Sequence, residues 1–252
     1  MKKLIKPLCA ASMLIASPVA LSDTILGIYT GGGVWNTDFS GNVGDVGQPS
    51  ADLEDLGLSD QDNNFLFIAL EHPIPIIPNI RLQSTDISQS ETGTITQSFV
   101  LDGDPYFFSQ EVTSDFDLSH VDATLYYELL DNWVNLDLGV TFRMFDGEIS
   151  MQSQTASGSR KLDETIPMLY GKAQFNLPLS GFYVAGGGNY VSYSGSDVSD
   201  LQASIGYMSD GLVLDFGIEL GIRTFSIELD DVSDLDADMK LDGTFASVYL
   251  HF

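Results

Sequence analysis

Long stretches of alternating apolar and polar residues constrain the fold of this chain more than any other feature. In 133–144 (WVNLDLGVTFRM), every second residue from Val134 onward is apolar, and the residues between them are polar or glycine. The same pattern recurs at 121–129, 201–208 and 212–223. Alternation with a period of two predicts β-strands, because successive side chains of a strand point to opposite faces.

The apolar sides of the longer of these strands are five or six residues long, which is about the length of a tilted strand that crosses a bilayer. The polar sides contain Gly139, Gly217 and Gly221. Glycine weakens a strand that faces water, but in a narrow lumen it leaves room for bulky neighbours such as Arg143 and Arg223. A β-structure in lipid must close on itself, because no edge can be left unpaired. The pattern therefore favours a closed antiparallel transmembrane β-barrel over a soluble sandwich or a lipocalin-like barrel.

The first 22 residues have the features of a secretory signal peptide. Three lysines precede an apolar stretch, and Ala20 and Ser22 are small residues at the cleavage positions before Asp23. We expect a signal peptide at 1–22 and one barrel domain at 23–252. Cys9 is the only cysteine and lies in this segment, so disulfides and thiolate metal sites are not expected in the mature chain.

The charge balance excludes one class of partner. The sequence has 36 acidic and 10 basic residues, and three of the basic ones fall in the expected signal peptide. Nucleic-acid binding requires clustered lysine and arginine. We therefore expect no nucleic-acid partner.

The last residues, TFASVYLHF (244–252), place Ala246, Val248, Leu250 and Phe252 on one strand face. With the expected signal peptide, the alternating strands, the short and long connections and this final strand, the chain resembles Gram-negative outer-membrane β-barrel proteins. In such proteins, a final strand that ends in an aromatic residue is similar to the signal read by the barrel-assembly machinery. By this resemblance, Val248, Leu250 and Phe252 are the assembly signal.

The segment EHPIPIIPNI (71–80) is similar to a marker of a small, uncharacterised family of outer-membrane barrels. The resemblance implies a location in the outer membrane of a Gram-negative bacterium, after cleavage near Ser22. It implies outer-membrane lipid, lipopolysaccharide and the assembly machinery as partners, and a monomer. It implies little chemistry.

Turn residues divide the chain into ten strands, an even number that places both ends on the short-turn side. Eight strands would result if 79–130 paired differently, and twelve if 37–61 contained a hairpin. The expected strands are 24–36, 62–72, 79–90, 111–130, 133–146, 165–177, 181–194, 199–209, 212–228 and 240–252. The expected long connections are 37–61, 91–110, 147–164, 195–198 and 229–239.

The alternation also predicts which charges face the lumen. In a ten-stranded barrel, side chains can nearly fill the interior, and buried charges are tolerated when they are paired. A lumen largely plugged by paired charges is therefore favoured over a solute path. The predicted lumen charges are Arg81, Asp122, Glu128, Asp137, Arg143, Lys172, Asp215, Glu219 and Arg223.

His120 and Asp122 lie two residues apart on one strand face, near the expected outer rim. A histidine beside a carboxylate can activate a water nucleophile, and the pair loosely resembles the barrel mouth of omptin-type outer-membrane proteases. The match ends at this pair, so we expect a protein that is not an enzyme, with a rim hydrolase as the least favoured function.

The expected loops are strongly acidic. Carboxylates at Asp231, Asp234, Asp236 and Asp238 are of the type that binds Ca²⁺ or Mg²⁺, but their spacing is not that of an EF-hand. We expect solvated loops and no bound metal or cofactor. The leading function is then a structural or surface-interaction role, with loops that contact lipopolysaccharide. The alternative is a narrow, porin-like pore or an uptake protein for small solutes.

Overall fold

The computed structural model describes residues 26–209, 211, 214–232 and 234–252. The expected signal peptide and its cleavage site lie outside this part of the chain. The strands are β1 (Gly27–Asp45), β2 (Ala51–Asp52), β3 (Gln61–Glu71), β4 (Asn79–Asp86), β5 (Ser88–Thr94), β6 (Phe99–Leu101), β7 (Asp104–Tyr106), β8 (Glu111–Asp117), β9 (His120–Asp131), β10 (Val134–Phe145), β11 (Gly147–Gln152), β12 (Ser157–Leu162), β13 (Thr165–Asn176), β14 (Phe182–Tyr193), β15 (Ser196–Ser209), β16 (Asp215–Val232) and β17 (Leu235–His251). The structure describes no helix long and apolar enough to cross a membrane.

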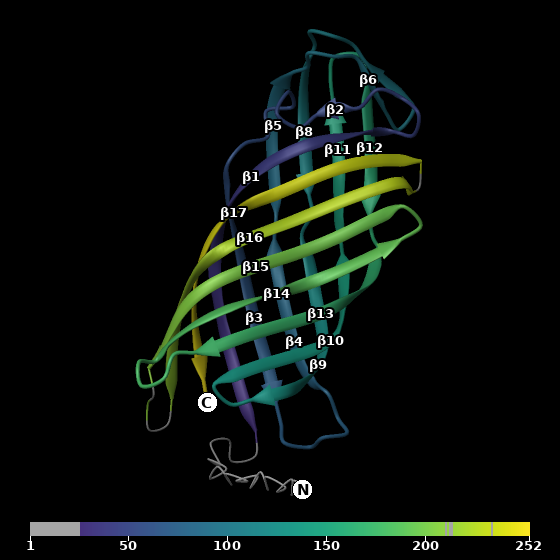
Figure 1. The fold of residues 1–252 in the computed structure, drawn as a ribbon. Coiled ribbons are helices and arrows are strands. Elements are labelled where there is room, and N and C mark those ends of the chain that lie inside the picture. Colours follow the sequence, from purple (N-terminus) through teal and green to yellow (C-terminus); the bar gives the residue numbers. More distant parts are fainter. Residues whose placement is uncertain (1–25, 210, 212–213, 233) are drawn as a thin grey trace, which may run out of the picture.

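Ten of these strands form a closed antiparallel barrel in the order β1-β3-β4-β9-β10-β13-β14-β15-β16-β17 (Figure 1). The barrel closes where β17 pairs with β1 along nearly the whole length of β1, from Tyr29 opposite His251 to Asp45 opposite Leu235. Ile28 and Phe252 extend this seam with two backbone hydrogen bonds, of 3.0 and 3.2 Å. The prediction of a closed ten-stranded barrel is confirmed.

An apolar belt surrounds the outer wall next to the short turns. Within it, Leu138 is 48% exposed and Ile218 is 43% exposed, as the alternation predicts. On β1 and β17 the belt ends at two register partners, Asn36 and Thr244, and beyond them the outward residues of these two strands are polar or charged. These residues include Asp38, Lys240 and Asp242.

Several strands continue beyond the belt, where the sequence predicted loops. β1 runs to Asp45, and the β16–β17 hairpin covers nearly all of 229–239. The loop predictions there are wrong because the alternation continues with its polarity reversed. Above the belt, Phe39 and Leu241 face inward, whereas Asp38 and Asp242 face outward.

The predicted loops 91–110 and 147–164 also contain strands. β5, β8, β11 and β12 form a second, four-stranded sheet that continues upward from β4, β9, β10 and β13 (Figure 1). We call this sheet, the β6–β7 hairpin and the segment 46–60 the head. Apolar residues of the head and of the upper barrel pack into one core. Its members include Trp35, Phe39, Leu53, Leu56, Phe116, Phe145, Ile149, Phe225 and Leu241.

Candidate functional site

Two arginines and two aspartates form a buried network inside the barrel, directly below the apolar core. Arg143 on β10 donates to both carboxylate oxygens of Asp122 on β9, at 2.8 and 2.7 Å. It also donates to Asp200 on β15 at 2.6 Å. Arg223 on β16 donates to both oxygens of Asp200, at 2.8 and 2.7 Å. We call this group the arginine–aspartate network.

Cation–π contacts join this network to the core above it. The guanidinium of Arg143 lies 4.9 Å from the ring centroid of Phe225, and that of Arg223 lies 4.4 Å from the ring of Trp35. Two positive and two negative charges balance within the group, which is the condition under which buried charges are tolerated. The network and the core together close the lumen toward the head.

His120 lies beside this network but belongs to the apolar core. Its ring packs 5.3 Å from Phe145 and 5.6 Å from Phe225, and Nδ1 lies 2.9 Å from the carbonyl oxygen of Leu118. It is 3% exposed. The prediction that His120 lies at an outer rim is wrong, because the head rises above it and covers it.

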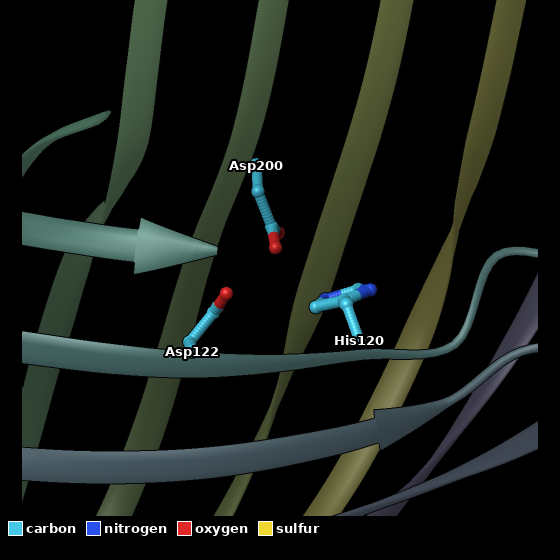
Figure 2. A group of neighbouring side chains, drawn as sticks. All are labelled: His120, Asp122 and Asp200. Carbon is cyan, nitrogen blue, oxygen red and sulfur yellow. The ribbon is translucent and has the colours of Figure 1, made fainter. Parts of the chain in front are cut away.

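His120, Asp122 and Asp200 point toward a common region (Figure 2), and their ligand atoms lie within 4.8 Å of one another. This arrangement does not suit a cation. Every carboxylate oxygen of the two aspartates already accepts a hydrogen bond from an arginine, and the guanidinium charges would repel a metal ion. No hydrogen bond joins His120 to Asp122 in the described part of the chain, so the pair also lacks the geometry of a catalytic dyad.

Below the network, the lumen is hollow. A cavity of about 510 Å³ extends from Arg223 and Phe245 down to the turn residues Asn132 and Leu179. Leu179 is fully exposed at the short-turn end, so the cavity opens there. We call it the vestibule. A smaller cavity of about 50 Å³ lies beside the network.

The structure places all nine predicted lumen charges on the inner side of the wall. Asp122 and Arg143 are in the network, and Arg223 joins the network to the vestibule. The remaining six line the vestibule. They are Arg81, Glu128, Asp137, Lys172, Asp215 and Glu219.

Sequence reasoning missed Asp200, which bridges the two arginines. The sequence contained a signal for it. Leu201, Ala203 and Ile205 alternate along the strand and face outward, so Asp200, the residue before Leu201, faces inward. The inward glycines were given the wrong role. A Cβ on Gly217 would lie 2.1 Å from the Tyr249 ring, and one on Gly221 would lie 2.6 Å from the Phe245 ring. These glycines accommodate aromatic rings, not the arginines.

A band of acidic residues crosses the lower vestibule wall. Glu128 on β9 and Asp137 on β10 are register partners on the inner face. Glu71, at the end of β3, accepts a hydrogen bond of 2.6 Å from the hydroxyl of Tyr126. Asn79 on β4 donates to Glu128 at 3.2 Å. The band is thus held by neighbours on four adjacent strands.

The acidic residues that were considered as candidate metal ligands lie at the end of the β16–β17 hairpin, outside the barrel. Asp231 and Asp234 have left-handed backbone conformations, and the Asp231 amide donates to Asp236 at 3.0 Å. Among the described residues, these aspartates and Asp238 do not form a group of three close ligand atoms. They lie in a strand hairpin and not in the solvated loop that was expected.

The residues of the expected assembly signal line the outer face of the closing strand. Val248 and Phe252 are 52% and 54% exposed in the apolar belt, and Leu250 shares their face. Their recognition during assembly stays a prediction.

No protein-family model matches the sequence, and no curated protein matches it. Three solved structures show a distant similarity that covers 91% of this chain in each case. The monoaromatic hydrocarbon channel CymD has 10% identity, a TM-score of 0.35 and 69% of its chain covered. The Ralstonia pickettii toluene transporter TbuX has 12% identity, a TM-score of 0.34 and 64% of its chain covered. The P. putida toluene transporter TodX has 10% identity, a TM-score of 0.28 and 90% of its chain covered. Similarities at this level establish no common function.

Proposed function

We propose that this protein is an integral outer-membrane β-barrel that binds a small solute in its vestibule and is closed to free diffusion in the described conformation. The closed wall and the apolar belt support the membrane location, because only a barrel without edges leaves no backbone group unpaired in lipid. In this proposal the short turns face the periplasm and the head projects from the cell surface.

The unequal filling of the lumen carries the proposal. Side chains can nearly fill a ten-stranded barrel, and in the upper half they do. The lower half keeps a cavity of about 510 Å³, which is within the range of small-molecule sites, about 300–1,000 Å³. A barrel with a purely structural role has no need of this volume. Aromatic rings in its lining, such as Phe67, Tyr126 and Tyr170, are also typical of ligand sites.

The closed upper half argues against an open pore. A solute in the vestibule meets the arginine–aspartate network and then the apolar core, so passage through the lumen requires both to rearrange. Planar-bilayer recordings of the wild type should accordingly show no steady open-channel current. A steady ohmic conductance would contradict the closed state.

Binding itself is tested with a variant that fills the vestibule. Gln174 faces the cavity, and the next residue, Phe175, faces the belt. We expect equilibrium dialysis of the purified protein against small solutes of different charge to find at least one that binds. Gln174→Trp should abolish this binding, and the matched outward variant Phe175→Trp should retain it. If no solute binds the wild type, or if both variants bind equally, the proposal fails.

A further inference from the structure

The vestibule wall holds two carboxylates in an unfavourable arrangement. Glu128 and Asp137 are directly opposite on adjacent strands, on the same inner face. Like charges in this position destabilise a sheet. Within the described residues, neither carboxylate forms an ion pair at contact distance. Folding alone therefore does not account for the pair.

Of the two carboxylates, Asp137 is the more deeply buried and lacks a partner for one of its oxygens. It is 8% exposed, it lines the vestibule, and its Oδ1 has no hydrogen-bond partner among the described residues. Lys172 is its register partner on β13, yet these two side chains form no ion pair. A buried carboxylate without a partner is costly. The arrangement indicates that a donor or a cation completes it.

Aromatic rings stand next to these carboxylates. Tyr126 and Tyr170 line the same cavity, with ring centroids 5.8 Å apart. Higher in the vestibule, Arg81 already lies over the Phe67 ring, 4.2 Å from its centroid. Aromatic faces bind organic ammonium groups through cation–π attraction. Rings and carboxylates together suit a ligand with a cationic head and an apolar body.

The excess of acidic over basic residues in the vestibule wall also favours a cationic ligand. Six acidic and three basic residues line the vestibule, and one of the basic residues, Arg223, is committed to Asp200. A bare metal ion fits less well. Among the described residues, Glu71, Glu128 and Asp137 do not bring three ligand atoms together closely enough for one, so the negative charge is spread over the wall.

We propose that the vestibule binds a small organic cation, with its ammonium group at Asp137 and Glu128 and its body against Tyr126 and Tyr170. This inference rests on the proposed function, that the vestibule is a solute site, and adds the class of solute. The acidic band recognises the charge, and the cavity volume sets the size.

The test compares choline with its neutral isostere, 3,3-dimethyl-1-butanol, by isothermal titration of the purified wild-type barrel. We expect choline to bind at least tenfold more tightly than the alcohol. Asp137→Asn and, separately, Glu128→Gln should each raise the choline Kd about tenfold or more and leave the affinity for the alcohol unchanged. Asp238→Asn makes the same charge change on the outer face of β17, above the belt, and should have no effect.

The outcomes separate the two proposals. If choline binds no better than the alcohol, or if Asp137→Asn and Glu128→Gln bind choline like the wild type, the cation inference is overturned. The solute site would still stand if other solutes bind and Gln174→Trp blocks them. If no solute binds at all, the proposed function fails as well. Heat-modifiable mobility confirms that each variant is folded before it is titrated.

Discussion

The upper and lower halves of this barrel use the same strands with opposite polarity. In the lower half, the outward residues are apolar and the inward residues are charged or aromatic around a cavity. In the upper half, inward residues such as Phe39 and Phe225 pack into a core, and outward residues such as Asp38 and Asp242 are acidic. The surrounding medium explains the difference, because lipid requires an apolar outer wall and water does not. The reversal marks the membrane boundary near Asn36 and Thr244.

The largest difference between the halves should appear when a fully buried arginine and a half-buried arginine are each removed. Arg143→Ala leaves Asp122 and Asp200 buried without this partner, and should destabilise the barrel by about 3–5 kcal/mol. Arg81→Ala removes a hydrogen bond to Gln83 and a ring contact from a water-accessible wall, and should cost about 1 kcal/mol. Urea-induced unfolding in liposomes measures both. Equal losses would show that the network is not buried as described.

Arginine in the belt sharpens the boundary between inner and outer faces. Leu138→Arg and Ile218→Arg should each destabilise the barrel by about 2–4 kcal/mol, because the charge would face lipid. Gln174→Arg is the inward control and should be milder, since the side chain can enter the vestibule. Thr141 is unsuitable as a control: it is fully buried and bonded to Thr124 and Asn189. Three equal and negligible effects in reversible liposome folding would contradict the membrane assignment.

Tyr106 tests the packing of the head. Its hydroxyl donates to the Met151 carbonyl at 2.7 Å and accepts the Gly158 amide at 2.8 Å. Tyr106→Phe leaves both groups without this partner and should destabilise the head by about 1–3 kcal/mol. Amide hydrogen exchange in β11 and β12 should then accelerate, with the belt strands unchanged. Acceleration throughout the barrel would instead mean that head and barrel unfold as one unit.

Tyr106 should also make the stability of the head depend on pH. Burial raises the pKa of Tyr106 above its ordinary value of 10.0, so above that pH the unfolded head releases this proton before the folded head does. The stability that depends on neutral Tyr106 is complete below pH 10 and is lost as the pH rises toward the folded pKa. Tyr106→Phe should lack this component. A variant with the same alkaline loss as the wild type would exclude Tyr106 as its source.

The smallest effect concerns the acidic β16–β17 hairpin above the belt, where a role in surface interactions remains a prediction. Direct contact with lipopolysaccharide phosphates would be repulsive, so divalent cations would have to lie between the two surfaces. Changing Asp231, Asp234, Asp236 and Asp238 to Asn should weaken Mg²⁺-dependent association with lipopolysaccharide at most about fivefold, because exposed ion pairs contribute little. Unchanged association in a pull-down across Mg²⁺ concentrations would leave this hairpin as an ordinary solvated surface.

Alternation and the turn residues together predicted the ten strands, the closed wall and the inward side of charges such as Arg143 and Asp137. They did not predict the head, because strands with an acidic outer face read as polar loops when an apolar outer face is expected. They also placed His120 at an open rim, since nothing local indicates that a distant sheet covers it.

The vestibule could not be predicted from the pattern either. Whether inward side chains fill a lumen depends on how aromatic rings pack against glycines on neighbouring strands, as the Tyr249 ring packs against Gly217. Composition and period carry no information about that packing. The network shows the same limit, because its bridging residue, Asp200, comes from a strand far from β9 and β10 in the barrel order.

Single-cysteine labelling tests the central claim, that the vestibule is open at the short turns and closed at the head. The only native cysteine, Cys9, lies in the expected signal peptide, so the mature chain offers a clean background. Ser159→Cys, exposed on β12 of the head, reports which end faces outward in proteoliposomes. With the head outward, an impermeant thiol reagent should label Ser159→Cys at once and should reach Gln174→Cys only after the liposomes are opened. Labelling of Gln174→Cys in sealed liposomes as fast as Ser159→Cys would contradict the account, because it would mean that the lumen is open from the head.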